Sequence, residues 1–231
     1  MNLYQIVQTF RFYVDEPDQT FLTNTQVQYF LRTAYNEYYN TIQQYNDQWF
    51  TDVHTIPNFN TQVDLNVSPN NLMGSGTFDG PGRLTRLVSV MNIDGSSGTP
   101  TYYYTAASNL TDFANRSTLK WFLSGPTLIF NAPFQADISL GYSYFPDIDF
   151  TKIGPNDDER LNDNLDQFHD LISLMMAKLY YIKDMTSNPA MSQEIMTRKN
   201  DMISFLAQGM AFESNQYVSR TWRRGNGYGV Q

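Results

Sequence analysis

Apolar and polar residues alternate most clearly between positions 119 and 149, where three short apolar runs are separated by turn residues. Ser124-Gly125-Pro126 separates the first two runs, and Asn131-Ala132-Pro133 helps to separate the last two. Over residues 137–145 the large apolar side chains occupy every second position, at Ile138, Leu140, Tyr142 and Tyr144. A period of two is typical of a half-buried strand in an antiparallel sheet. The segment therefore predicts a three-stranded meander.

The first 45 residues carry a helical period instead. A short helix is predicted over residues 2–14, with apolar positions at Leu3, Ile6, Val7, Phe10 and Val14. A second helix is predicted from Thr25 to Tyr45, because its apolar stripe advances by three or four residues at each step. The stripe consists of Val27, Leu31, Ala34, Tyr38, Ile42 and Tyr45. Thr23 or Asn24 can cap this helix by accepting a hydrogen bond from a backbone N–H group.

Two further helical faces lie near the C-terminus. The first consists of Phe168, Leu171, Ile172, Met175, Leu179 and Ile182, and the second of Met191, Ile195, Met202, Phe205 and Leu206. Asn188-Pro189 interrupts the pattern between them, and the second helix is predicted to end near Gly209. The glycine-rich residues 213–231 cannot fold alone, so we expect them to form an extended tail that is ordered only against a partner.

These patterns predict an α+β protein. Residues 1–46 and 167–212 would form a helical bundle from the N- and C-terminal helices. Residues 47–150, with a strand at Arg83–Ile93, would form an inserted antiparallel β-domain. Residues 151–166 would be an acidic linker, and residues 213–231 would be the extended C-terminal tail. A chain of 231 residues is long enough to bury a substantial core.

Charge narrows the class of function. The formal net charge of −8 disfavours a general nucleic-acid binder, which needs basic surface to displace counterions. The acidic residues are concentrated in 1–70 and 147–170, whereas residues 213–231 are net basic.

The absence of cysteine excludes disulfides, a thiolate nucleophile and a cysteine-ligated zinc site. No run reaches the roughly 20 apolar residues of a membrane helix, and no signal-peptide pattern is present, so we expect a soluble protein without membrane contact.

Motifs that carry chemistry are scarce. His54 and His169 lack the spacing of a metal-ligand pair, so we expect structural roles for both. Residues 74–80 contain glycines but lack the Lys-Ser/Thr pair of a phosphate-binding loop, which favours a mobile loop. Ser124 is outside any Gly-x-Ser-x-Gly motif. Asp157-Asp158-Glu159 lacks the ligand spacing of a calcium loop and is interpreted as helix capping and solvation. We predict no catalytic residue, no metal site and no cofactor.

The order of these parts resembles a known family, the head-to-tail adaptor (connector, neck or ring) proteins of tailed bacteriophages. A short helix leads into the Thr-capped helix that begins at Leu22-Thr23-Asn24-Thr25-Gln26-Val27. The β-region closes with the pattern W-x-x-x-G-x-x-L-x-x-x-x-P from Trp121 to Pro133, and with Y-x-x-x-P from Tyr142 to Pro146. Phe168-His169-Asp170-Leu171-Ile172 then opens paired helices.

The resemblance implies a structural role in the virion. In that family a helical bundle carries an inserted β-domain, and identical subunits form a ring, commonly a dodecamer, between the portal and the tail. The resemblance therefore implies a non-enzymatic protein of the phage neck, synthesised in the host cytoplasm. Its partners would be its own copies, the portal protein and a tail or second neck protein. Genomic DNA would pass through the channel without specific binding.

The C-terminal tail contains the interface residues that we predict. Trp222 with Arg223 and Arg224 combines an aromatic anchor with guanidinium donors, which are enriched where interfaces hold most of their energy. Arg220 and Tyr228 complete the set, and the neighbouring glycines let the segment follow a partner surface. We predict that residues 214–231 thread into a neighbouring subunit or into the portal.

Two other classes of function remain open. The many Tyr and Asn residues would suit a carbohydrate-binding or receptor-binding virion module, although such a module leaves the two C-terminal helices unexplained. A cell-wall hydrolase would need two carboxylates across a cleft. Asp and Glu residues are plentiful, but nothing in the sequence selects a pair.

Overall fold

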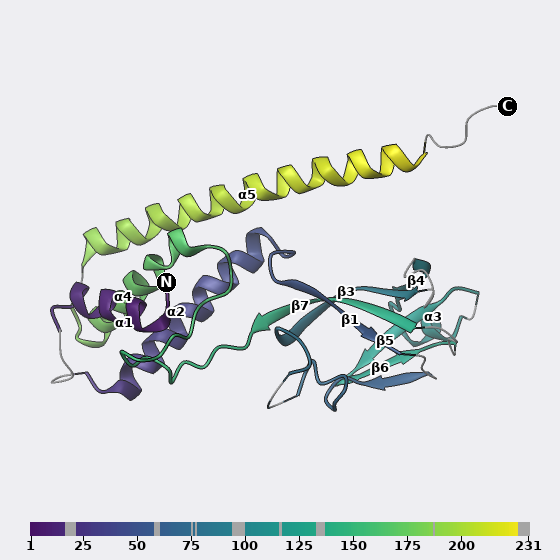
Figure 1. Ribbon diagram of the computed structural model, residues 1–231, viewed down its shortest axis with the longest axis horizontal. Helices are drawn as coiled ribbons and strands as arrows, with labels where there is room; N and C mark the ends of the chain where they lie inside the picture. The colour runs from purple at the N-terminus through teal and green to yellow at the C-terminus, as the bar shows by residue number, and fades with distance from the viewer. Residues whose placement is uncertain are drawn as a thin grey trace. The chain divides into compact units, whose positions relative to one another are not determined.

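The chain folds as an α+β protein, with five α-helices and one seven-stranded sheet in the part that the structure describes (Figure 1). This computed structural model describes residues 1–16, 22–57, 61–74, 76, 78–93, 100–115, 117–132, 137–186 and 188–225, with only the backbone for 92–93, 100–103 and 209–225. Two compact units divide the chain. The first unit combines Met1–Trp49 with Ile148–Gln231, and the second is Phe50–Asp147.

Helices form the framework of the first unit. They are α1 (Leu3–Tyr13), α2 (Asn24–Tyr45), α4 (Asp170–Lys183) and α5 (Pro189–Gly225). Helix α4 is central, because α1, α2 and α5 all contact it. Its residues 171–177 are buried without interruption, which matches a helix covered on several sides. The helices predicted over residues 2–14 and from Thr25 to Tyr45 are confirmed as α1 and α2.

The N-terminal helices both begin with a capping box. In α2 the Thr23 hydroxyl accepts the backbone N–H of Gln26 at 3.3 Å, and the Gln26 side chain accepts the N–H of Thr23 at 3.2 Å. Asn2 and Gln5 make the same reciprocal pair at the start of α1. These bonds satisfy backbone donors that have no partner inside the helix. The predicted cap at Thr23 is confirmed.

Helix α4 ends with a residue in the left-handed conformation, Met185 (φ 54°). The N–H of Thr186 donates to the carbonyl of Tyr181 at 2.9 Å, and the N–H of Met185 donates to that of Ile182 at 3.1 Å. This pair of bonds is the Schellman motif, which usually places glycine where Met185 stands. Asp15 (φ 55°) ends α1 in the same conformation.

A curled sheet forms the second unit. Its strands are β1 (Thr51–Ile56), β2 (Gln62–Asp64), β3 (Gly82–Ile93), β4 (Pro100–Ala106), β5 (Lys120–Ser124), β6 (Thr127–Phe130) and β7 (Asp137–Pro146). Their order is β1-β7-β3-β4-β5-β6-β2, and every neighbouring pair is antiparallel except β4 and β5. A short helix, α3 (Leu110–Ala114), lies between β4 and β5 in the sequence. One apolar cluster with residues from β1, β2, β3, β4, β6 and β7 forms the core.

The predicted strand over residues 137–145 is confirmed, but the meander is wrong. Ile138, Leu140 and Tyr142 are fully buried in the core, as the period of two requires. Strands β5 and β6 form the expected hairpin. Strand β7 instead pairs with β1 and β3, and β2 takes the free edge of β6. The short strand β2 lies too far upstream in the sequence to be connected to β6 by local turn signals.

Residues 151–166, predicted as an acidic linker, are packed against the helices of the first unit. The segment has no regular helix or strand before the 3₁₀ turn Asp166–Phe168, yet Leu161, Asp163 and Leu165 are buried. The carbonyl of Glu159 also accepts the N–H of Leu3 at 2.8 Å. Apolar residues at alternate positions between the acidic residues fix this segment to the helices. Amino-acid composition alone does not reveal this alternation.

The prediction of an extended tail is wrong for residues 213–225. Helix α5 continues through Gly209 and ends at Gly225. Glycine in a helix interior costs about 1 kcal/mol relative to alanine, and good helix formers on both sides of Gly209 can offset that cost. No proline follows before the end of the sequence. Residues 226–231 lie outside the described residues.

Candidate functional site

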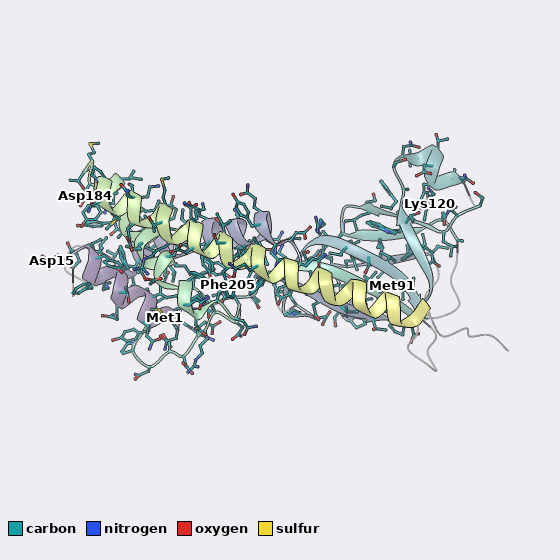
Figure 2. The ribbon with its side chains drawn as sticks, turned by 90° about the horizontal axis from the view of Figure 1, so that it is seen from above. Met1, Asp15, Met91, Lys120, Asp184 and Phe205 are labelled. Atoms are coloured by element: carbon teal, nitrogen blue, oxygen red, sulfur yellow. The ribbon has the colours of Figure 1, made fainter. Side chains whose placement is uncertain are left out.

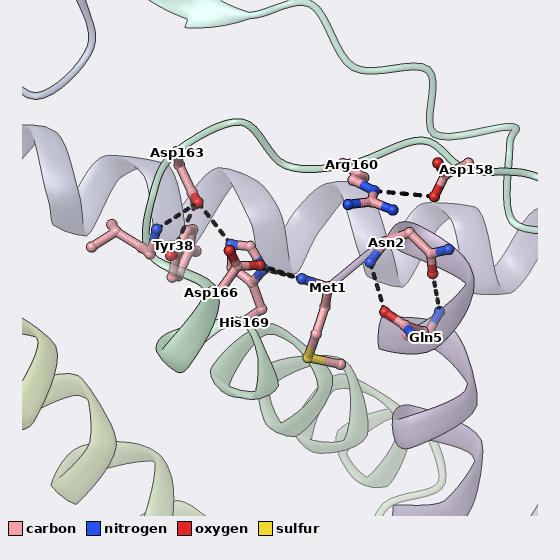
Figure 3. Close-up of polar contacts among 10 residues, drawn as sticks. Met1, Asn2, Gln5, Tyr38, Asp158, Arg160, Asp163, Asp166 and His169 are labelled. Carbon is pink, nitrogen blue, oxygen red and sulfur yellow. Dashed lines mark hydrogen bonds and ion pairs between the residues drawn. The ribbon is translucent and has the colours of Figure 1, made fainter.

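A cluster of buried polar side chains lies where the segment before α4 meets α2 (Figure 3). Asp163 is at its centre: the hydroxyl of Tyr38 donates to Oδ2 at 3.1 Å, and Nε2 of His169 lies 2.8 Å from Oδ1. The backbone N–H of Leu165 donates to the same Oδ1 at 3.0 Å. The indole Nε1 of Trp49 donates to the backbone carbonyl of Asp163 at 2.7 Å. Four contacts therefore hold one buried aspartate.

Local sequence places each member of this buried cluster. Tyr38 belongs to the apolar stripe of α2, so its ring is buried and only its hydroxyl needs a partner. His169 is the residue immediately before α4. Asp163 lies between the buried Leu161 and Leu165, in a segment where buried and exposed residues alternate, and it takes one of the inward positions. That alternation is the sequence signal that could have located Asp163.

A second carboxylate approaches the other side of the imidazole. Oδ1 of Asp166 lies 3.4 Å from Nδ1 of His169, and the amino group of Met1 lies 3.3 Å from the same nitrogen. Asp166 also accepts a hydrogen bond from the Met1 ammonium, which lowers the pKa of this carboxyl. Burial raises the pKa of the Tyr38 hydroxyl, and the adjacent Asp163 carboxylate raises it further.

The geometry of this cluster suits a structural role. A carboxylate and the imidazole that it orients are also two of the three members of a catalytic triad, in which the histidine must face a nucleophile. Here both ring nitrogens of His169 face carboxylates or the Met1 amine. His169 is 0% exposed, so a substrate has no access to the ring. The cluster can fix α2, α4 and the segment between residues 158 and 168 in place, because an aspartate with several donors is held firmly.

A concave polar surface, here named the polar hollow, lies beside this cluster. It encloses about 390 Å³ and is lined by Met1, Asn2, Gln5, Arg160, Leu161, Asn162, Asn164 and Asp166. Arg160, Asn162 and Asn164 are exposed, and they alternate with the buried residues of the same segment. Nε of Arg160 donates to Oδ1 of Asp158 at 3.1 Å. Sequence reasoning missed this surface, because its residue types are unremarkable in isolation.

The structure describes the backbone of four of the five interface residues predicted from the sequence. Arg220, Trp222, Arg223 and Arg224 lie in the last turns of α5, where the structure describes the backbone alone. Tyr228 lies outside the described residues. Four of the five therefore lie on one helix.

The other chemical candidates each have a local partner. Nε2 of His54, in β1, lies 3.0 Å from Oδ1 of Asn70. The carboxylate of Asp79, in the glycine-rich loop, accepts the N–H of Asn71 at 2.5 Å. Ser124 ends β5.

The interpretation of Asp157-Asp158-Glu159 as helix capping is wrong. Asp157 accepts the N–H of Gly154 at 2.7 Å, Asp158 accepts from Arg160, and Glu159 accepts from Lys152 at 3.3 Å. None of these bonds reaches the first turn of α4, which begins only at Asp170. Within the described residues no group of three or more His, Asp or Glu side chains is arranged to hold a metal ion.

Comparison of the chain with protein-family models and with curated proteins finds no match. A search of the described helices for one long and apolar enough to cross a bilayer also finds none.

Proposed function

We propose that this chain is a structural subunit of a phage neck ring that joins the portal to the tail. The order of elements carries the proposal: α1 and α2 precede a β-unit, and α4 and α5 follow it. We infer that these four helices form a bundle into which the β-domain is inserted, which is the arrangement that the resemblance to head-to-tail adaptors implies. The chain would act by shape and contact, with no bond made or broken.

The buried cluster around Asp163 supports a role in assembly. A ring subunit must present the same surface to every neighbour, so its elements need fixed positions. Tyr38, His169 and Trp49 converge on Asp163 from separate parts of the first unit. Buried polar networks of this kind specify one arrangement when every member has a partner.

Net charge supports passage of DNA through such a ring. The chain carries a formal charge of −8, and residues 147–170 are among its most acidic stretches. Acidic side chains that line a channel would repel phosphates, so DNA would slide without binding. A channel lined by lysine and arginine would contradict this part of the proposal.

A carbohydrate-binding role has weaker support. An open hollow in the second unit is lined by Asn109, Thr111, Asp112, Asn115 and Phe122, among others, and its composition would suit a sugar. Its acceptors are already occupied, however. The carboxylate of Asp112 accepts from Lys120 and from the N–H of Ser108, and Oδ1 of Asn109 accepts the N–H of Asp112 at 2.8 Å.

The test is to locate the protein in assembled particles. Antibodies against the purified chain, coupled to gold, would be applied to phage particles whose genome encodes it and imaged by electron microscopy. We expect label at the junction of head and tail, and ring-shaped assemblies in images of the purified protein or of its complex with portal. Antibodies against the major capsid protein serve as the control for labelling elsewhere. Particles that lack this chain would overturn the proposal.

A further inference from the structure

The polar hollow contains hydrogen-bonding groups that the fold does not use. The side-chain amides of Asn162 and Asn164 and the terminal nitrogens of Arg160 have no hydrogen-bond partner among the described residues. These three residues stand at every second position of one exposed edge. The chain bends at Asp163 and Asn164, where the φ of Asn164 is 57°, so this edge is a bend of the segment and not a strand.

The edge is held rigidly from behind. Leu161, Asp163 and Leu165 point inward between the exposed residues, and Asp163 is held by Tyr38 and His169. The N–H of Leu3 also donates to the carbonyl of Glu159 at 2.8 Å. A binding surface that is already ordered loses little conformational entropy when a ligand docks.

The charges around the polar hollow are already paired. Asp158 is bound by Arg160, and Asp166 by the Met1 ammonium, as Figure 3 shows. The two carboxylates would repel an anionic ligand such as a phosphate. Two free side-chain amides instead match the one donor and one acceptor of each peptide group. The chemistry that fits is an uncharged extended peptide.

The end of the sequence has this chemistry. Residues 225–231 read Gly-Asn-Gly-Tyr-Gly-Val-Gln and carry no charged side chain. Glycine occupies every second position, at 225, 227 and 229. In an extended chain alternate residues point to opposite faces, so one face of this segment would carry no side chain at those positions. Such a face lets the backbone approach the amides of Asn162 and Asn164 closely.

A subunit cannot fill its own polar hollow with this segment. Helix α5 passes the start of α4 where the rings of Phe205 and Phe168 lie 5.6 Å apart. It continues from Phe205 to Gly225, a rise of about 30 Å, and Figure 2 shows it running on beyond Phe205 and away from Met1. Residues 226–231 span at most about 22 Å when fully extended. They are too short to return.

We propose that residues 226–231 of one copy, which follow the end of α5, dock in the polar hollow of a second copy, with the face that carries Gly227 and Gly229 against Asn162 and Asn164. This proposal rests on the proposed ring and names the contact that joins its subunits. The two surfaces lie on different parts of the same chain, so the contact is heterologous. Such contacts repeat from copy to copy and close into a ring when the rotation permits.

A peptide experiment tests the docking directly. A fluorescently labelled synthetic peptide of residues 224–231 would be titrated with the full-length Gly227→Val/Gly229→Val chain, whose own end should not compete for the hollow, and its anisotropy measured. We expect saturable binding. A peptide with Gly227→Val and Gly229→Val should bind at least about tenfold more weakly, because the added side chains separate the backbone from the amides. The matched control peptide, with Asn226→Ala and Val230→Ala, alters the other face and should bind within about threefold of the original.

The hollow is tested on the protein side. Asn162→Ala should weaken binding of the 224–231 peptide by about tenfold, the loss that one hydrogen bond predicts. Asn156→Ala, an exposed residue of the same segment outside the hollow, is the matched control. Circular dichroism of both variants verifies that they fold. Equal binding to the Asn162→Ala and Asn156→Ala proteins would overturn the proposed docking site.

Sedimentation velocity separates this inference from the proposed function. If the chain forms rings and the Gly227→Val/Gly229→Val chain forms them equally well, the docking contact is wrong while the ring stands. If the chain is absent from particles, yet copies associate in solution and Asn162→Ala weakens both that association and peptide binding, the ring is wrong while the docking contact stands. Loss of rings in the valine variant, with rings kept in the Asn226→Ala/Val230→Ala chain, supports both.

Discussion

At the scale of single residues, the two histidines show how position decides a role that residue type leaves open. Both were expected to be structural, because neither has a metal-ligand spacing. His54 is a partly exposed strand residue bonded to Asn70, whereas His169 is fully buried between Asp163 and Asp166. The sequence contains no signal for that difference, since the burial of His169 depends on how α2 and the segment before α4 meet.

His169→Ala should therefore be strongly destabilising. It removes one partner of a buried carboxylate, and a buried polar group that loses its partner typically costs about 1–3 kcal/mol, or more when the group is charged. Urea unfolding followed by circular dichroism at 222 nm would measure the loss in the helical unit. His54→Ala is the matched control and should cost about 1 kcal/mol, the usual value of a single hydrogen bond. Equal losses in the two variants would show that the cluster around Asp163 does not hold the unit together.

Met185 provides a prediction of the opposite sign. Its side chain is 97% exposed and its φ of 54° is unfavourable for any residue with a Cβ. Met185→Gly should stabilise the protein by up to about 1 kcal/mol, because it relieves that conformation and removes no packing. The control is Met196→Gly, which changes an exposed methionine in the interior of α5 and should cost about 1 kcal/mol. Thermal unfolding of the two variants should shift in opposite directions.

At the scale of elements, α3 is attached to the sheet by an ion pair and by a ring contact, in which Phe113 and Phe122 lie 6.2 Å apart. Lys120 of β5 is bound to the carboxylate of Asp112 in α3, which also accepts the N–H of Ser108 at 2.9 Å. These bonds lower the pKa of Asp112 to about 2, with the Lys120 hydrogen bond as the largest cause. The ordinary pKa of an aspartate is about 3.9 in an unfolded chain. The carboxylate therefore supports α3 fully above that value and loses its effect as the pH falls toward 2.

Acid titration should show this attachment. The carboxyl carbon of Asp112, followed by NMR, should titrate near pH 2, and the amides of α3 should lose protection from hydrogen exchange in the same range. Lys120→Met should move the pKa of Asp112 upward, toward its ordinary value. A pKa of Asp112 that is unchanged by Lys120→Met would show that the pair is not formed in solution.

How well an element could be predicted depended on how local its determinants are. The stripes of α1 and α2 and the alternation in β7 are complete within one segment, and each was found from the sequence. The pairing of β7 with β3 and of β2 with β6 joins residues more than forty positions apart, for which the sequence has no local signal. The polar hollow was missed for the same reason, since Asn2 and Asn164 meet only in the folded unit.

At the scale of the whole molecule, the chain passes from the first unit into the second and back again through two neighbouring strands, β1 and β7. Thr51 near the start of β1 pairs with Ser143 of β7, and the carbonyl of Phe50 accepts the N–H of Tyr144 at 3.0 Å. Paired residues on antiparallel strands are about 5 Å apart. An insertion whose two ends are so close can be removed without stretching the chain that carries it.

Replacement of Phe50–Asp147 by a Gly-Ser linker of about eight residues should therefore leave a folded helical unit. We expect a helical circular dichroism spectrum and cooperative thermal unfolding, because every contact of the cluster around Asp163 lies within Met1–Trp49 and Ile148–Gln231. His169→Ala should destabilise the shortened chain as much as the full chain, since distant and independent sites add. If the shortened chain unfolded without cooperativity, the helices would depend on the β-unit for their fold, and the insertion would be a structural part of one domain.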